Sequence, residues 1–224
     1  METNVIEAPD IAEHAAPMGA RIDELAPDFA ARSTLGEVRL SDYRGRWVML
    51  FSHPADFTPV CTSEFVAIQK AADRFADIGC DLIGLSVDSL YAHIAWVKDI
   101  EARFGVRIGF PIVEDISMAV SRAYGMIHDA SASTAAVRSV FFIDPNGYVR
   151  AVIHYPMNVG RSVEELLRVA EALQVSDAGT AATPEGWRSG EDTVLPPPLD
   201  QNEADARSGL NGGVWYYTHS GDAS

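Results

Sequence analysis

The amino-acid sequence predicts an α/β domain, because patterns typical of buried strands alternate along it with patterns typical of helices. The run "WVMLFS" (47–52) is continuously apolar and has the length of a strand covered on both faces, and "DLIGLSV" (81–87) repeats this pattern. Between the two runs, apolar residues recur at helical spacing until a glycine ends the helix: Phe65, Ile68, Ala72, Phe75 and Gly79. Strand, helix and strand therefore follow one another over this part of the chain.

The next elements continue the alternation. Residues 89–105 are predicted to form a second helix. Three of its apolar residues are expected to face inward: Ile94, Val97 and Ile100. A short strand over 111–115 and a short helix over 117–125 are predicted after it.

The last part of the domain is predicted to be a hairpin and a closing helix. Two apolar runs, 139–144 and 148–154, flank the turn "PNG" and indicate an antiparallel hairpin. Residues 161–173 are predicted to form a helix, in which Ser162 and Glu165 match a capping box. Strand, helix, strand and helix, followed by a hairpin and a closing helix, is the order of the thioredoxin-like fold, which we therefore predict.

The two ends of the chain differ in composition from its centre. Residues 1–19 are rich in Ala, Glu and Pro without periodicity, and we expect a flexible arm there, followed by the domain over 20–176. Residues 177–224 contain a triple proline and are loop-like, which predicts a separate C-terminal arm. The arm ends in "GGVWYYTH" (212–219), whose large aromatic side chains should be buried against the domain or against a second subunit.

Charge and composition exclude several classes of function. The 224 residues carry a formal charge of −15, with four acids and no Lys or Arg in 1–20 and eight acids against two arginines in 176–224. Such a chain is not expected to bind nucleic acid or an anionic membrane. The sequence has no apolar run of membrane-spanning length, and its N-terminus lacks the pattern of a secretory signal. Two cysteines in so long a chain fit a reducing compartment, so we predict a cytoplasmic protein.

One of the two cysteines, Cys61, is predicted to lie at the first turn of a helix. It falls in "HPADFTPVCTSEF" (53–65), between the strand at 47–52 and the helix that follows. A thiol reacts as its thiolate, and the unpaired N–H groups and the dipole at a helix start stabilise an anion. Thr58, three residues earlier, can place its hydroxyl beside the sulfur, while Pro54 and Pro59 stiffen the loop.

The same stretch closely resembles the active site of peroxiredoxins. That family carries Pro-x-x-x-Thr-x-x-Cys, matched by Pro54, Thr58 and Cys61, and "SHPADFTPVCT" is most similar to its one-cysteine, or peroxiredoxin six, subfamily. Other segments resemble the family in the same order, and the resemblance covers about residues 20–200: "GLSVDS" (84–89), "VRSVFFIDPNG" (137–147), "HYPMNVGRSVEELLRVAEALQ" (154–174) and "TPEGW" (183–187).

The resemblance implies a role for each matching residue. Cys61 would be the peroxidatic cysteine, whose thiolate takes an oxygen from hydrogen peroxide or an organic hydroperoxide and becomes a sulfenic acid. Arg138 would stabilise the thiolate and bind the peroxide together with Thr58, and Pro54 would shield the pocket from water. No metal, haem or flavin is implied.

Three further residues match positions around this site. Glu64 and Arg161 correspond to residues that orient Arg138 in the family, and His53 corresponds to a residue at the edge of the pocket. Without the resemblance, Glu64 would be read as a first-turn carboxylate that complements the helix dipole, and Arg161 as a surface residue. The remaining histidines have no spacing that would gather them with Cys61 into a metal site, and we expect them to be solvated or packed: His14, His93, His128, His154 and His219.

The second cysteine, Cys80, is expected to be structural. It opens the strand after the helix that begins near Cys61, and that helix of roughly 17 residues would be about 25 Å long. A disulfide requires Cα atoms within about 7 Å, so the helix would have to unwind. We therefore predict a one-cysteine mechanism in which an external thiol, such as thioredoxin, glutathione or a small thiol, reduces Cys61.

Three other classes of function remain to be weighed. A thioredoxin-type reductase needs Cys-x-x-Cys, and Glu64 occupies the position of its second cysteine. A lipase serine reported for some members of the branch is replaced here by Arg46. A non-catalytic chaperone of the holdase type, or a redox sensor on the same scaffold, is the alternative function.

By resemblance, the protein is expected to be a homodimer joined through its C-terminal arm, with a decamer as the larger assembly.

Overall fold

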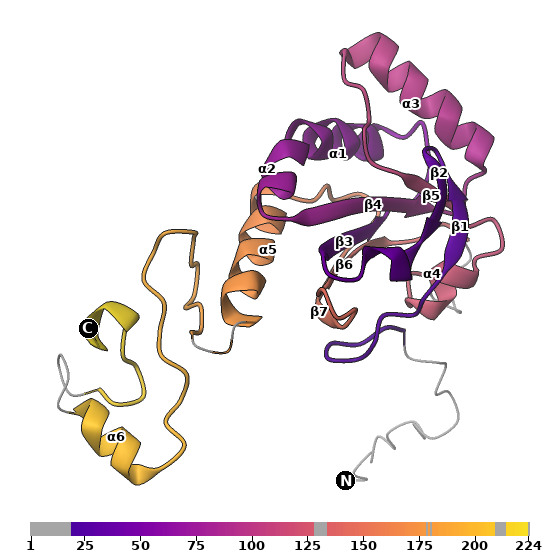
Figure 1. Cartoon of the computed structure of the whole chain (residues 1–224). Helices are drawn as coiled ribbons and strands as arrows, with labels where there is room; N and C mark the ends of the chain where they lie inside the picture. The colour runs from indigo at the N-terminus through magenta and orange to yellow at the C-terminus, as the bar shows by residue number, and fades with distance from the viewer. Residues whose placement is uncertain (1–18, 128–133, 178, 180, 209–213, 224) are drawn as a thin grey trace, which may run out of the picture.

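A mixed sheet forms the centre of the computed structural model, which describes residues 19–127, 134–177, 179, 181–208 and 214–223 (Figure 1). Its seven strands lie in the order β2-β1-β5-β4-β3-β6-β7. The strands have these bounds: β1 Ala30–Ser33, β2 Gly36–Arg39, β3 Trp47–Ser52, β4 Cys80–Ser86, β5 Ile112–Glu114, β6 Arg138–Ile143 and β7 Val149–Tyr155. β3, β4 and β5 are parallel, whereas β6 runs antiparallel to β3 and to β7. The predicted α/β architecture is confirmed.

Helices cover both faces of this sheet. Their bounds are α1 Pro59–Lys70, α2 Ala72–Asp77, α3 Leu90–Phe104, α4 Ala119–Ala123, α5 Val163–Asp177 and α6 Gln201–Ser208, with 3-10 turns at Leu40–Tyr43 and Ser220–Ala223. None of the helices in the described ranges has the length and apolarity needed to cross a membrane.

The side chains of β3 alternate between two hydrophobic cores. Met49 and Phe51 pack on one face with residues of α1, α2, α3 and α5, and Val48 and Leu50 pack on the other face with residues of α4. Every residue of β3 is buried, which explains why the run is apolar without alternation. Since β3 lies between β4 and β6, the residues that follow its last residue, Ser52, emerge at the middle of the sheet edge.

Three details differ from the predicted elements. The single helix expected to end at Gly79 is two helices, because the backbone leaves helical geometry at Ala71 (φ −99°, ψ 2°). Strands β1 and β2 form a hairpin that was not predicted. The inward face of α3 was predicted only in part: Ile100 is buried and Val97 packs partly buried against the core, but the other buried residues are His93 and Trp96, and Ile94 is not among them.

The capping box predicted at the start of α5 is half formed. The Ser162 hydroxyl accepts a hydrogen bond from the Glu165 N–H at 3.4 Å. The Glu165 carboxylate accepts hydrogen bonds from Arg168 instead of returning to the serine. The serine therefore caps the helix, and the glutamate acts in a surface ion pair.

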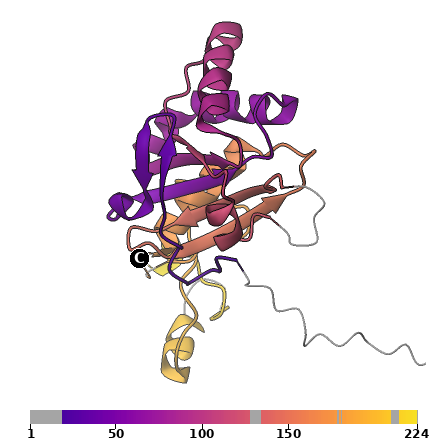
Figure 2. The ribbon, with the colours of Figure 1, turned by 90° about the vertical axis from the view of Figure 1, so that its right-hand side faces the viewer.

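The residues that follow α5 extend away from the sheet. In both views this C-terminal segment lies at the opposite end of the molecule from α3 (Figures 1 and 2). Trp187 is buried, but Trp215, Tyr216 and Tyr217 are 44%, 72% and 53% exposed. The prediction that these aromatics are buried against their own domain is therefore wrong, and burial against a second subunit stays a prediction. Nearly all of the predicted N-terminal arm, residues 1–18, lies outside the described residues.

Candidate active site

Cys61 is the third residue of α1, just beyond the carboxyl end of β3. Pro59 opens the helix, where its fixed φ suits the first turn and its missing N–H costs nothing. Thr58 occupies the N-cap position, but its side chain makes no capping hydrogen bond. The side chain of the N-cap residue therefore leaves the N–H groups of the first turn, where Cys61 lies, without an acceptor. Cys61 itself is fully buried.

Arg138 reaches the sulfur from the first residue of β6. Its Nη1 donates to Cys61 Sγ at 3.3 Å and to Glu64 Oε2 at 2.7 Å. Its Nε and Nη2 donate to the main-chain carbonyl of Met157 at 2.9 and 2.7 Å. All three guanidinium nitrogens are thus held, and the side chain is 2% exposed, so the charge is fixed beside the sulfur rather than mobile.

Glu64 links two buried arginines one turn along α1 from the cysteine. Its Oε1 accepts from the Arg161 main-chain N–H and Nε at 2.8 and 2.9 Å, and its Oε2 accepts from Arg161 Nη2 at 2.7 Å. Arg161 Nη1 also donates to the carbonyls of Ser52 and Ser139. The structure therefore brings Glu64, Arg138 and Arg161 together with Cys61, as the resemblance implied.

Charge balance shows what this cluster suits. Arg138 and Arg161 contribute two positive charges and Glu64 one negative charge, and all three side chains are at most 2% exposed. A buried charge is costly unless it is compensated. The cluster becomes neutral when Cys61 carries the fourth charge as a thiolate. The residues around the sulfur are therefore arranged for an anion.

Thr58 and Pro54 lie on the loop that connects β3 to α1. The Thr58 hydroxyl donates to the main-chain carbonyl of Ala55 at 2.8 Å and makes no hydrogen bond to Cys61. Because its hydrogen is donated to that carbonyl, the hydroxyl can use its oxygen lone pairs to accept a hydrogen bond from another group. Pro54 is buried, as expected of a residue that keeps water from the pocket.

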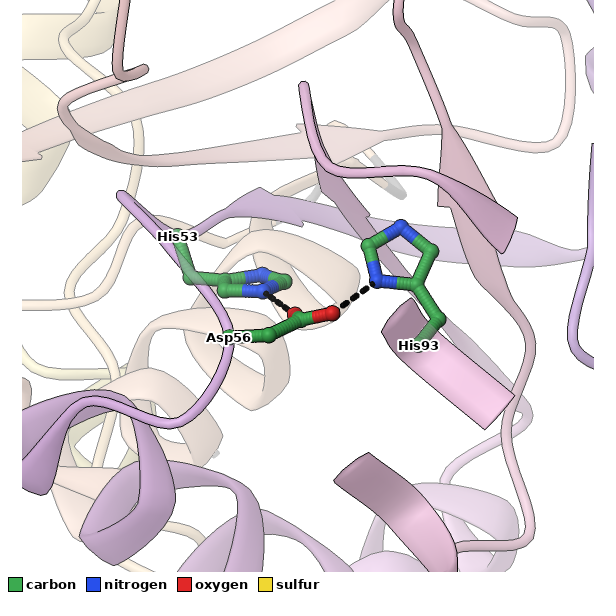
Figure 3. Close-up of side chains that lie close together, drawn as sticks. All are labelled: His53, Asp56 and His93. Atoms are coloured by element: carbon green, nitrogen blue, oxygen red, sulfur yellow. Dashed lines mark hydrogen bonds and ion pairs between the residues drawn. The ribbon is translucent and has the colours of Figure 1, made fainter. Parts of the chain in front are cut away.

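His53 forms a buried group with Asp56 and His93 (Figure 3). Its Nε2 and Asp56 Oδ1 are 2.8 Å apart, and His93 Nδ1 lies 2.8 Å from Asp56 Oδ2. Burial lowers the pKa of His53. Burial alone would raise the pKa of Asp56, but the hydrogen bonds from the two imidazoles outweigh it and the pKa is lowered. These three side chains are close enough together to share a metal ion.

Asp56 and His93 are functional candidates that the sequence did not reveal. Asp56 lies inside the active-site stretch, but His93 lies on α3 and was considered only for its spacing to Cys61. His154 and His219 take no part in the group, and His14 and His128 lie outside the described residues. One feature of the sequence could have indicated His93: it lies on the same face of an amphipathic helix as the apolar residues Trp96 and Ile100.

The lowered pKa of His53 predicts a pH-dependent stability. A histidine whose folded pKa lies below its unfolded value of about 6.5 stabilises the fold above that value, and this contribution is lost as the pH falls. We therefore expect the melting temperature to decrease between about pH 7.5 and 5. The decrease should be smaller in His53→Gln, which cannot titrate. Equal decreases in both proteins would show that another group is responsible.

Cys80 lies at the other end of the sheet from Cys61. It pairs with Trp47 at the start of β3, whereas Cys61 follows Ser52 at the end of the same strand. At about 3.3 Å per residue the two ends of this strand are roughly 17 Å apart, well beyond the reach of a disulfide. Burial, followed by the charge of Asp81, raises the pKa of Cys80 to about 12, so its thiol stays protonated.

Replacing Cys80 with alanine is therefore expected to leave peroxide turnover unchanged. An external thiol should still complete the cycle, since Cys80 can neither approach the oxidised sulfur nor supply a thiolate at neutral pH. Steady-state peroxide consumption with dithiothreitol measures this directly. Loss of turnover in Cys80→Ala, or a Cys61–Cys80 disulfide in peptide mass spectra of the wild type, would contradict the prediction.

Comparisons with known proteins agree with this geometry. Residues 22–152 match the family model described as AhpC/TSA family, and residues 172–209 match the C-terminal domain of 1-Cys peroxiredoxin. The chain is 45% identical to peroxiredoxin 2 of Picrophilus torridus over 199 residues, covering 89% of this chain and 98% of that protein. It is 45% identical to the peroxiredoxin of Aquifex aeolicus, over 88% of this chain and 94% of that one.

Two solved structures are similar over nearly their whole length. Yeast mitochondrial 1-Cys peroxiredoxin superposes with a TM-score of 0.80 at 39% identity, covering 89% of this chain and 99% of that chain. Peroxiredoxin 6 of Arenicola marina superposes with a TM-score of 0.79 at 31% identity, covering 90% and 98%. The predicted thioredoxin-like fold is thereby confirmed. The chain belongs to the AhpC/TSA family, in its one-cysteine peroxiredoxin branch, and is a thiol peroxidase.

Proposed function

We propose that the protein reduces hydrogen peroxide and organic hydroperoxides by a one-cysteine mechanism, with Cys61 as the peroxidatic nucleophile and an external thiol as reductant. The observation that carries this proposal is the Arg138 guanidinium, which donates to Cys61 Sγ while Glu64 and a main-chain carbonyl hold it in place. A sulfur so placed at a helix start is suited to react as a thiolate.

The reaction balances with thiols as the only electron donors. The Cys61 thiolate attacks the terminal oxygen of the hydroperoxide, the O–O bond breaks, and the leaving alkoxide or hydroxide takes up a proton to give alcohol or water. Cys61 is then a sulfenic acid. One external thiol displaces water to form a mixed disulfide, and a second thiol attacks this disulfide and restores Cys61. We propose no metal, haem or flavin for this cycle.

Arg138, Thr58 and Pro54 support the first step. The Arg138 guanidinium would stabilise the charge that develops on the leaving oxygen, as an oxyanion-hole donor does. The Thr58 hydroxyl, which donates its hydrogen to the Ala55 carbonyl, would accept a hydrogen bond from the O–H of the peroxide. Pro54 would exclude water from the pocket, and Glu64 and Arg161 would keep Arg138 oriented.

The one-cysteine mechanism is supported by the position and protonation of Cys80. Thioredoxin and glutathione are the reductant classes to consider, because the yeast mitochondrial 1-Cys peroxiredoxin is described as resolved through glutathione and thioredoxin systems. A homodimer is supported by the match to a 1-Cys peroxiredoxin C-terminal domain and by exposed Trp215, Tyr216 and Tyr217, and a decamer is the larger assembly that we propose. We also propose a cytoplasmic location.

Intact-mass spectrometry after one equivalent of peroxide tests this proposal. The wild type and Cys80→Ala should each gain one oxygen atom, and Cys61→Ser should gain none. Adding glutathione, or thioredoxin with its reductase, should return the mass to its starting value with the productive reductant. Oxygen uptake by Cys61→Ser, or an internal disulfide in the wild type, would refute the mechanism.

A further inference from the structure

We propose that Asp56 and His93 are positioning residues for residues 53–58, here called the peroxide-binding loop, which carries Pro54 and Thr58. This inference rests on the peroxidase function proposed above. It adds two residues that are not among the motif positions Pro54, Thr58 and Cys61.

Asp56 joins the peroxide-binding loop to a different element, helix α3. Its side chain is 3% exposed and lies between two fully buried imidazoles, at 2.8 Å from each (Figure 3). His53 belongs to the loop itself, whereas His93 lies in the first turn of α3. That turn is well anchored, because the Ser89 hydroxyl caps it by accepting from the Ala92 N–H. The link from His93 thus fixes the loop to a rigid support.

The main chain of the loop is tied at the same residue. The Asp56 N–H donates to Asp88 Oδ2 at 2.9 Å, and this oxygen also accepts from the Ser86 hydroxyl at 2.9 Å. Ser86 is the last residue of β4 and Asp88 follows two residues later. Asp56 is therefore held to the neighbouring strand end by its main chain and to α3 by its side chain.

A strained residue directly after Asp56 shows why these anchors matter. Phe57 adopts a φ of +56°, in the left-handed region that a bulky side chain rarely occupies. Such a conformation persists only where the surroundings impose it. The Phe57 side chain is 58% exposed, so its own packing does not impose it. The bonds made by Asp56 supply the constraint on one side, and helix α1 supplies it on the other.

This constraint determines where the Thr58 hydroxyl points. Thr58 follows Phe57, and its hydroxyl donates to the carbonyl of Ala55, the residue before Asp56. Both ends of that hydrogen bond therefore flank the anchored residue. If Asp56 shifts, the carbonyl and the hydroxyl shift with it, and the Thr58 oxygen that would accept a hydrogen bond from the peroxide is misplaced.

Hydrogen bonds account for this group better than a bound metal does. A carboxylate only accepts, so His53 must carry a hydrogen on Nε2 and His93 on Nδ1, and 2.8 Å is an ordinary hydrogen-bond distance. A metal ion at these atoms would have to replace both hydrogens. Each imidazole is thereby fixed in one tautomer, which suits a support rather than an open coordination site.

Substitution of His93 tests the inference away from the sulfur. His93→Leu removes the N–H donor at similar size, and His93→Asn keeps a donor close to the position of Nδ1. Because a misplacement of about 1 Å in a reacting geometry can cost about 100-fold in rate, we expect His93→Leu to react with hydrogen peroxide about 10- to 100-fold more slowly. His93→Asn should recover most of the rate, and Asp56→Asn should lose rate as His93→Leu does.

The matched control is Ile100→Ala, which removes a buried side chain from the same helix and leaves the hydrogen bonds intact. Stopped-flow fluorescence would give the peroxide rate constant, and alkylation by iodoacetamide would report the reactivity of Cys61 without a bound peroxide. We expect iodoacetamide to alkylate His93→Leu no more slowly than the wild type, because the substitution impairs the binding of peroxide and not the sulfur itself.

The outcomes separate this inference from the proposed function. A wild type that does not consume peroxide would overturn both. A reactive wild type matched in rate by His93→Leu would overturn only the positioning role, as would an equal loss of rate in Ile100→Ala. Stoichiometric metal in the wild type that is retained in Cys61→Ser and lost in His93→Leu would also overturn it, since the group would then be a metal site.

Discussion

Replacing Arg138 with methionine is expected to slow the reaction of the protein with hydrogen peroxide by about 100- to 1,000-fold, the usual cost of removing one donor aimed at developing negative charge. The guanidinium donates to Cys61 Sγ, and in the proposed mechanism it would also stabilise the charge on the leaving oxygen. Without it, Glu64 and Arg161 neutralise each other, and a thiolate at Cys61 would be a buried charge without compensation. Stopped-flow fluorescence with excess peroxide would measure the rate constant.

Two further variants make this result specific. Arg138→Lys keeps the charge but cannot reach the sulfur, Glu64 and the Met157 carbonyl at once, so its rate should lie between those of the wild type and Arg138→Met. Arg168→Met removes an arginine whose partner, Glu165, lies on the surface of α5, and it should react like the wild type. A rate for Arg138→Met within the range of Arg168→Met would show that the guanidinium takes no part in the chemistry.

Hydrophobic pattern predicted the central strands well and the edge of the sheet poorly. β3 and β4 are apolar throughout because both of their faces are covered, and that pattern is visible without a structure. β1 and β2 have only four residues each, and only Ser33 in one and Val38 in the other are buried. Strands with one buried residue have no periodicity to recognise, so their pairing follows from the tertiary fold.

The error in α3 has a physical cause of its own. Hydrophobicity placed Ile94 and Val97 inward. Val97 does pack against the core, but only partly buried, and the fully buried stripe runs through His93 and Trp96. Both side chains find a hydrogen-bond partner inside the protein, His93 Nδ1 with Asp56 and Trp96 Nε1 with the Thr62 hydroxyl. A polar group that finds its partner across more than thirty residues can be buried, and no local pattern shows this.

The side chains of the candidate site could be predicted from the sequence, but the main-chain contacts around them could not. Cys61, Glu64, Arg138 and Arg161 were identified by resemblance, and they are in contact in the structure. The carbonyl of Met157, which holds two nitrogens of Arg138, could not be predicted, because any residue supplies a main-chain carbonyl. The link from the loop to α3 was missed for a similar reason, since it depends on how two distant segments pack.

Removing Glu64 is expected to cause the largest loss of stability among the substitutions considered. Its carboxylate is 2% exposed and accepts four hydrogen bonds, one from Arg138 and three from Arg161. Glu64→Ala would leave two buried guanidinium groups without their counter-charge, and breaking a buried ion pair in this way costs about 3–5 kcal/mol. Urea unfolding at neutral pH, followed by circular dichroism, would measure the change in the free energy of unfolding.

A surface glutamate provides the matched control. Glu164 also pairs with an arginine, Arg74, but its side chain is 65% exposed and that of Arg74 is 54% exposed. Solvent screens such a pair, so Glu164→Ala should unfold like the wild type. Comparable losses in Glu64→Ala and Glu164→Ala would show that burial of the carboxylate does not determine its contribution.

Removing the negative charge of Glu64 should affect the reactivity of the Cys61 sulfur in the opposite direction from removing the positive charge of Arg138. Glu64→Gln removes a negative charge one turn from Cys61 and leaves both guanidinium groups, so a thiolate gains compensation. Arg138→Met removes a positive charge, so a thiolate at Cys61 loses part of its charge compensation. At mildly acidic pH we therefore expect iodoacetamide to react faster with Glu64→Gln than with the wild type and more slowly with Arg138→Met. Changes of the same sign in both variants would mean that loosened packing, rather than charge, controls the reactivity of Cys61.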